Sequence, residues 1–114
     1  MHELSIAHSL LSIIERSVPS GNKGTVTEVH LDVGTLSAIE LDALVFSFDI
    51  IKDKTISSKA NLIINSIQGK GKCRSCGSVF PIDKFGEACP ECNSFSIDIL
   101  QGKELKITSI SIED

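Results

Sequence analysis

The chain has 114 residues, enough for one domain or for one small domain with a satellite. Its 15 acidic and 11 basic residues give a formal net charge of −4, which argues against nucleic acid as the main partner because phosphate binding needs a basic face. No apolar run approaches the roughly 20 residues of a membrane-spanning helix and no targeting segment is evident, so a cytoplasmic protein without a membrane partner is expected.

Residues 4–18 predict an amphipathic helix of about four turns, because leucines and isoleucines recur on one side of the helical wheel and polar residues on the other. If the helical phase extends back to the N-terminus, Glu3 lies in the middle of the apolar face. A carboxylate in the first turn is favoured by the helix dipole, which gives Glu3 a purely structural explanation.

Three stretches predict the strands of one small sheet: residues 25–34, 60–68 and 103–112. In the first, Val29, Leu31 and Val33 on one face alternate with Glu28, His30 and Asp32 on the other. On this polar face His30 is expected to be solvated rather than a ligand. In the last strand the apolar phase flips near Thr108, which predicts a β-bulge or a break in pairing.

A second helix is predicted to begin at a capping box, with Ser37 as N-cap and Glu40 as N3. Leu36 and Leu41 are spaced for a hydrophobic staple around this cap. Glu40 and Asp42 thus have an ordinary explanation as cap and first-turn acid.

The second helix carries two apolar stripes that lie nearly opposite each other. One stripe can pack on the sheet, and the other needs a cover of its own, either the first helix or a partner protein. The first stripe contains Leu41, Leu44, Val45, Phe48 and Ile51, and the second contains Ile39, Phe46 and Ile50.

All four cysteines fall in two Cys-x-x-Cys pairs, separated by twelve residues: Cys73, Cys76, Cys89 and Cys92. Two such pairs brought together form a closed tetrahedral set of thiolates, the signature of structural Zn²⁺. Gly77 and Asn93 follow the pairs and tolerate the positive φ that such tight turns often need. Two disulfides, two redox dithiols or an iron site are the alternatives, and ligand geometry alone does not separate iron from zinc.

The predicted fold class is α+β: a small three-stranded sheet with two helices, plus an inserted four-cysteine zinc-ribbon module. Residues 1–68 and 103–114 form the first predicted domain, and residues 69–102 form the zinc-binding domain. Within the module, Phe80, Pro81 and Phe85 are expected to form a hydrophobic lid on the metal. A further strand at residues 95–100 either stays in the module or joins the main sheet.

The opening residues Met1-His2-Glu3 offer a second metal site. The free α-amine, the amide nitrogen of His2 and its imidazole can close two chelate rings, and a planar set of nitrogen donors suits Ni(II) or Cu(II). A three-residue motif also occurs by chance, so the pattern alone leaves metal binding open.

The chain resembles the HypA/HybF family of hydrogenase nickel-incorporation proteins over essentially its whole length. The matching residues are Met1-His2-Glu3, the segment 33–37, both cysteine pairs, and the tail from Gly102 through Ser109 and Ile110. The resemblance implies a nickel metallochaperone rather than an enzyme, with Ni²⁺ held by Met1, His2 and Glu3 and structural Zn²⁺ held by the four cysteines. Glu40 or Asp42 is the candidate for an accessory acidic residue.

The resemblance also implies partners. These are a nickel-handling GTPase of the maturation pathway, the large subunit of [NiFe]-hydrogenase and, as a further option, urease accessory proteins. Two alternatives stay open at this point: a zinc-ribbon module for protein or nucleic-acid interaction without a nickel function, and a rubredoxin-like electron carrier with iron on the same thiolates.

Overall fold

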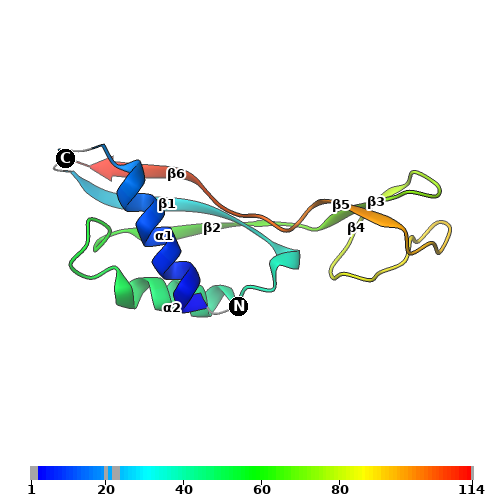
Figure 1. Ribbon diagram of the computed structural model, residues 1–114, viewed down its shortest axis with the longest axis horizontal. Coiled ribbons are helices and arrows are strands. Elements are labelled where there is room, and N and C mark those ends of the chain that lie inside the picture. Colours follow the sequence, from blue (N-terminus) through cyan, green and yellow to red (C-terminus); the bar gives the residue numbers. More distant parts are fainter. Residues whose placement is uncertain (1–2, 20, 22–23, 114) are drawn as a thin grey trace. The chain divides into compact units, whose positions relative to one another are not determined.

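The computed structural model describes residues 3–19, 21 and 24–113. Two three-stranded sheets occur in this part of the chain, with strand orders β2-β1-β6 and β4-β3-β5 (Figure 1). The first is the predicted sheet, accompanied by the two predicted helices. In chain order the elements are α1 (Glu3–Ser17), β1 (Thr25–Gly34), η1 (Thr35–Ser37), α2 (Leu41–Ile51), β2 (Asn61–Ile67), β3 (Lys70–Cys73), β4 (Val79–Pro81), β5 (Ile97–Gln101) and β6 (Leu105–Glu113).

The chain divides into two compact units. Residues 1–31, 39–64 and 107–114 form one, here called the helical unit, and residues 32–38 and 65–106 form the other, the cysteine unit. The cysteine unit thus contains the predicted module 69–102 together with residues 32–38, 65–68 and 103–106, which the sequence had placed in the first domain. Neither helix among the described residues is long and apolar enough to cross a membrane.

The core of the helical unit lies between the helices and one face of the sheet. Helix α1 has the predicted amphipathic pattern, and it packs against α2. Strand β1 is central in its sheet, which explains why its inward side chains are fully buried. The buried apolar residues include Ile6, Ala7, Leu10, Leu11 and Ile14 of α1, Val26, Val29 and Leu31 of β1, and Leu44 and Phe48 of α2.

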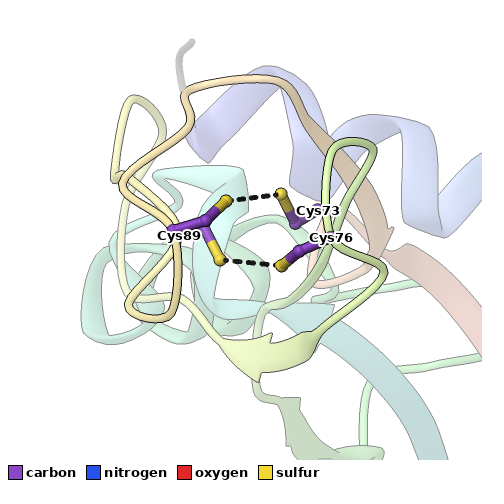
Figure 2. Close-up of side chains that lie close together, drawn as sticks. Cys73, Cys76 and Cys89 are labelled. Atoms are coloured by element: carbon purple, nitrogen blue, oxygen red, sulfur yellow. Dashed lines mark hydrogen bonds between the residues drawn. The ribbon is translucent and has the colours of Figure 1, made fainter.

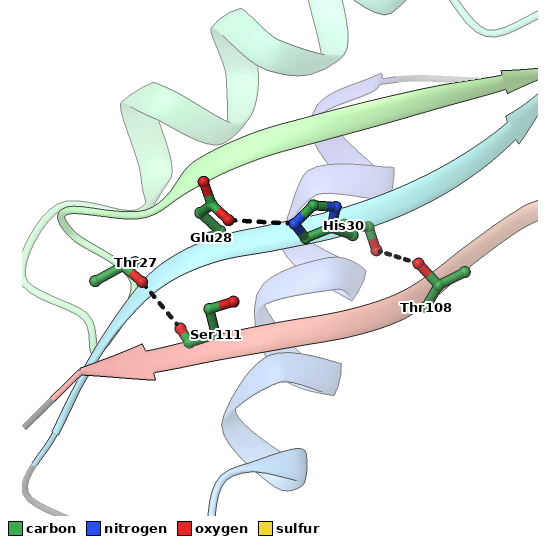
Figure 3. A network of polar contacts seen from close by, with 5 residues as sticks. All are labelled: Thr27, Glu28, His30, Thr108 and Ser111. Atoms are coloured by element: carbon green, nitrogen blue, oxygen red, sulfur yellow. Dashed lines mark hydrogen bonds and ion pairs between the residues drawn. The ribbon is translucent and has the colours of Figure 1, made fainter.

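Threonine hydroxyls form hydrogen bonds between the neighbouring strands β1 and β6 (Figure 3). The Thr108 hydroxyl donates to the His30 carbonyl over 3.3 Å, and the Thr27 hydroxyl donates to the Ser111 carbonyl over 3.4 Å. The His30 ring lies 3.2 Å from the Glu28 carboxylate on the same face of β1. Strand β6 is continuous from Leu105 to Glu113, and the bulge or break in pairing expected near Thr108 stays a prediction.

The start of α2 differs from the prediction. Ser37 ends η1 and its hydroxyl donates to the Gly34 carbonyl over 2.7 Å, and Ala38 then adopts the left-handed conformation with φ of 59°. That residue interrupts the helical phase, so Glu40 becomes the N-cap and the capping box is wrong. The hydrophobic staple is wrong for the same reason, because Leu36 packs in the core of the cysteine unit.

The sheet of the cysteine unit is antiparallel. Strand β3 pairs with β4 through Gly71 opposite Phe80, and with β5 through Cys73 opposite Ile97. The strand predicted at 95–100 is therefore β5, and the alternative that placed it in the main sheet is wrong. The core is small and contains Leu36, Cys73, Phe80, Ile82 and Cys89.

The predicted hydrophobic lid is wrong in two of its three residues. Phe80 is buried, but Pro81 and Phe85 are exposed, and Ile82 takes a core position instead. Pro81 points away from the core because side chains alternate along β4 and the residue that follows it, whereas Phe85 lies in an exposed turn after the strand.

Three glycines meet where segments of the cysteine unit cross. A Cβ atom on Gly34 would lie 1.9 Å from the Gly102 carbonyl oxygen, and one on Gly102 would lie 2.6 Å from Cα of Gly69. Hydrogen bonds accompany this close approach, since the Leu36 amide donates to the Gly102 carbonyl and the Gly34 amide to the Glu104 carbonyl, both over 2.8 Å. We call Gly34, Gly69 and Gly102 the glycine crossing.

Candidate metal centre

The four cysteines form one cluster, in which Cys73 is the last residue of β3; Figure 2 labels Cys73, Cys76 and Cys89. The four sulfur atoms all lie within 4.8 Å of one another. Two of the separations are 3.6 Å, between Cys73 and Cys92 and between Cys76 and Cys89. A tetrahedral ion with metal–sulfur bonds of about 2.3 Å requires sulfur atoms about 3.8 Å apart, so the arrangement fits a tetrahedral thiolate site.

The two cysteine loops have the same backbone hydrogen bonding. In each loop the amide of the first cysteine donates to the carbonyl five residues later, and the amide four residues later donates to the carbonyl of that cysteine. In the first loop, the Cys73 amide donates to the Ser78 carbonyl and the Gly77 amide to the Cys73 carbonyl, both over 2.9 Å. In the second loop, the Cys89 amide donates to the Ser94 carbonyl over 2.8 Å and the Asn93 amide to the Cys89 carbonyl over 2.9 Å. The predicted positive φ is confirmed at 80° for Gly77 and 64° for Asn93.

The sulfur atoms differ in exposure and in proton affinity. Cys73 and Cys89 are buried, whereas Cys76 and Cys92 are exposed. The Cys76 backbone amide is the main cause that lowers the pKa of Cys73 to about 6, against the opposing effect of burial. The Ser94 amide lowers the pKa of Cys92, but Cys73, burial and the other two sulfurs raise it to about 12. Four adjacent thiols cannot all ionise without a metal, because their negative charges would repel one another. A bound dication compensates these charges and allows all four to be thiolates.

Polar contacts outside the sulfur cluster hold the loops in place. The guanidinium of Arg74 donates through Nε and Nη2 to one oxygen of Asp98 on β5, over 2.7 and 2.6 Å. The same guanidinium lowers the pKa of the Asp98 carboxyl. The Ser75 hydroxyl lies 3.0 Å from that of Ser94 and joins the two cysteine loops directly.

The residues predicted for nickel are only partly within the described chain. Met1 and His2 lie outside the described residues. Glu3 is the first residue of α1 and half-buried, and its Oε2 atom accepts a hydrogen bond from the Glu40 backbone amide over 3.2 Å. Asp42 is exposed in the first turn of α2. The structure therefore brings Glu3 and Glu40 together, although they are 37 positions apart.

This contact has a clear physical reason. The amides at the start of a helix lack partners within the helix and favour a nearby negative charge. Glu40 provides no side-chain cap for α2, and the carboxylate of Glu3 supplies an acceptor at that end. Sequence reasoning placed Glu3 on the apolar side of α1 but gave no sign of the helix end that it meets.

Comparison with known proteins places the chain in a family. The family model described as "Hydrogenase/urease nickel incorporation, metallochaperone, hypA" matches residues 1–112. The chain belongs to this family. Among HypA relatives, the hydrogenase maturation factor HypA of Parabacteroides distasonis is 37% identical over 113 residues, covering 99% of this chain and 98% of the relative. The hydrogenase maturation factor HypA of Trichodesmium erythraeum is 38% identical over 114 residues, covering 100% of this chain and 97% of the relative.

Solved HypA structures share the fold. A solution structure of HypA protein has a TM-score of 0.70 at 26% identity, covering 99% of this chain and 97% of that one. The solution structure of the Ni metallochaperone HypA from Helicobacter pylori also has a TM-score of 0.70, at 24% identity, covering 98% of this chain and 97% of that one. The arrangement of two helices and two small sheets in this chain is thus a fold that it shares with solved HypA structures.

Three residues of the HypA-type cysteine unit were not predicted to support the site. The backbone carbonyls of Ser78 and Ser94 accept hydrogen bonds from the amides of Cys73 and Cys89, and Leu36 packs in the same small core as these cysteines. Both carbonyls lie five residues after the first cysteine of their loop, and because the contacts use the backbone, the side chains at these positions gave no specific signal. Leu36 gave no signal either, because η1 is three residues long and shows no periodicity.

Proposed function

We propose that this protein, a HypA-family nickel metallochaperone of hydrogenase maturation, binds Ni(II) at its first three residues. The observation that carries the proposal is the family match, which begins at Met1 and includes the Met1-His2-Glu3 opening. Nickel is the cargo of this site. An exchangeable chelate at a chain terminus suits delivery, because the next protein can replace its ligands one at a time.

The donor chemistry supports nickel at this end of the chain. The α-amine, the His2 amide nitrogen and the imidazole form a nitrogen set of the planar kind that Ni(II) favours. The Glu3 carboxylate adds a hard oxygen donor at the start of α1, held against the Glu40 amide. Glu40 and Asp42 are accessory acidic candidates, of which Glu40 is the one adjacent to Glu3.

We propose Zn²⁺ as the resident ion of Cys73, Cys76, Cys89 and Cys92. Four thiolates at tetrahedral spacing suit zinc, and their softness separates this site from the nitrogen-donor nickel site. Bound zinc supplies a crosslink between the two cysteine loops. Since all four positions of the ion are then occupied by protein, the site has no open position for a reacting molecule, which supports a structural and non-enzymatic role.

We further propose that the nickel passes to a nickel-handling GTPase and then to the hydrogenase large subunit in the cytoplasm. Urease accessory proteins are a second class of recipient, which the family description supports by naming urease beside hydrogenase. The net charge of −4 favours protein partners over nucleic acid.

His2→Ala is expected to abolish high-affinity nickel binding, because it removes the imidazole that closes the second chelate ring. Calorimetric titration of untagged protein with NiCl₂ measures this directly. Zinc content and melting temperature should stay at the wild-type values, since the cysteine unit does not involve His2.

The matched control is His8→Ala, which removes an exposed histidine of α1 and should leave nickel affinity unchanged. An extension at the N-terminus that blocks the α-amine should weaken binding as His2→Ala does. Equal nickel affinity in His2→Ala and wild-type protein would refute the proposed site.

A further inference from the structure

Helix α2 has one face that the rest of the helical unit does not cover. Leu44 and Phe48 are fully buried, yet Phe46 is 67% exposed and Ile50 is 58% exposed. The sequence showed that this second apolar stripe needs a cover. The structure shows that α1, although it packs against α2, does not provide that cover for Phe46 and Ile50.

Acidic side chains line the same face. At 100° per residue, Asp42 and Asp49 lie within about 60° of Phe46 around the helix axis, on the side away from Ile50. Both aspartates are exposed, as is Asp53 just beyond the end of the helix. The exposed face of α2 thus consists of an apolar stripe with an acidic margin.

Two lysines follow this face in sequence: Lys54 is exposed next to Asp53, whereas Lys52 is held away from the surface. Lys52 is largely buried, and its ammonium group donates to the Ala60 carbonyl over 2.8 Å and lies 3.0 Å from Asp49. The acidic character extends to the whole helical unit, which contains nine acidic and five basic residues and so has a net charge of −4. The cysteine unit has six acidic and six basic residues and a net charge of zero. The whole net negative charge of the chain therefore belongs to the helical unit, which contains α2.

We propose that the exposed face of α2 docks into an apolar groove, rimmed by lysine and arginine, on the protein that receives the nickel. This inference rests on the proposed function and names the surface used for the transfer. Ala43, Phe46 and Ile50 have the i, i+3, i+7 spacing with which a helix inserts into a groove. The acidic margin complements a basic rim, which accelerates encounter and selects the partner.

The charge argues against a second copy of this chain as the occupant. A two-fold symmetric pair through α2 would place the same acidic margin on both sides, and like charges across an interface are unfavourable. A surface of three helical turns is also small compared with the roughly 1,200–2,000 Å² buried in stable complexes. A small interface gives fast dissociation, as a delivery protein requires.

The test uses full-length, zinc-loaded protein and the purified nickel-handling GTPase as the probe. Phe46→Ser/Ile50→Ser should raise the Kd at least tenfold. Asp49→Lys/Asp53→Lys should slow association at least fivefold at low salt, and the difference from wild type should vanish near 1 M salt. Phe95→Ser is the matched control, because Phe95 is an exposed aromatic residue of the cysteine unit, and its Kd should equal that of wild type.

Nickel titration of the same variants separates this inference from the proposed function, since all of them should bind nickel as wild type does. Wild-type affinity for the GTPase in Phe46→Ser/Ile50→Ser would overturn the inference, as would a wild-type protein that does not bind the GTPase. A wild-type dimer that dissociates in this variant would assign the face to a second copy. A melting temperature several degrees lower would mean that the face packs within its own chain, which also overturns the inference.

Discussion

Cys89→Ser is expected to release the metal from the cysteine unit and to unfold that unit, while α1 and α2 remain folded. The apolar cluster beneath the metal site contains five buried residues, and two of them are the ligands Cys73 and Cys89. So little apolar burial cannot offset the conformational entropy of some 50 ordered residues without the metal. Structural zinc contributes roughly 10–16 kcal/mol of apparent binding free energy at pH 7, which is folding free energy in such a unit.

Metal analysis together with amide NMR spectra measures this result. Wild-type protein should contain one zinc per chain and be colourless, whereas a coloured protein would indicate iron. Ser75→Ala is the control within the same site, because it removes one exposed hydroxyl contact and should cost about 1 kcal/mol or less. Dispersed amide signals for residues 70–101 in metal-free Cys89→Ser would contradict a metal-dependent fold.

Gly34→Ala should destabilise the protein by about 3 kcal/mol or more. The φ of Gly34 is −76°, which alanine adopts without strain, so the whole effect comes from the new methyl group. That methyl would lie 1.9 Å from the Gly102 carbonyl oxygen, and a backbone atom cannot move aside as a flexible side chain can. Two hydrogen bonds of 2.8 Å at the crossing would be disturbed by the shift.

Urea denaturation of zinc-loaded protein measures the free energy of unfolding. Gly86→Ala is the matched control: a Cβ there meets nothing within 4 Å, and the φ of 89° makes the cost purely conformational, about 1–2 kcal/mol. If Gly34→Ala were no less stable than Gly86→Ala, the close approach at the glycine crossing would be wrong.

The elements that sequence reasoning predicted well are those with long periodic patterns. Helix α1 has 15 residues and β1 has ten, so each repeats its apolar period several times. Strands β3 and β4 have four and three residues, and such lengths show no period. The start of α2 was mispredicted for another reason: the spacing of Ser37 and Glu40 suits a capping box, but one left-handed residue, Ala38, separates them.

The metal centre was predicted in its ligands but not in its support. The cysteine spacing predicted that all four sulfurs converge, because two short loops suffice to define the cluster. The contact of Glu3 with the Glu40 amide and the burial of Leu36 beneath the cysteines could not be predicted. Both depend on how segments more than 30 residues apart meet in space, which no local pattern encodes.

The strand order has a consequence for biosynthesis. Strand β1 is central in its sheet, and one of its two neighbours, β6, ends at Glu113. At about 5–20 residues per second, roughly 4–16 s separate the synthesis of β1 from that of β6. The cysteines between residues 73 and 92 are made within this interval. The three-stranded sheet of the helical unit can therefore be completed only after all four cysteines have been synthesised, so the sheet closes at the last step of biosynthesis.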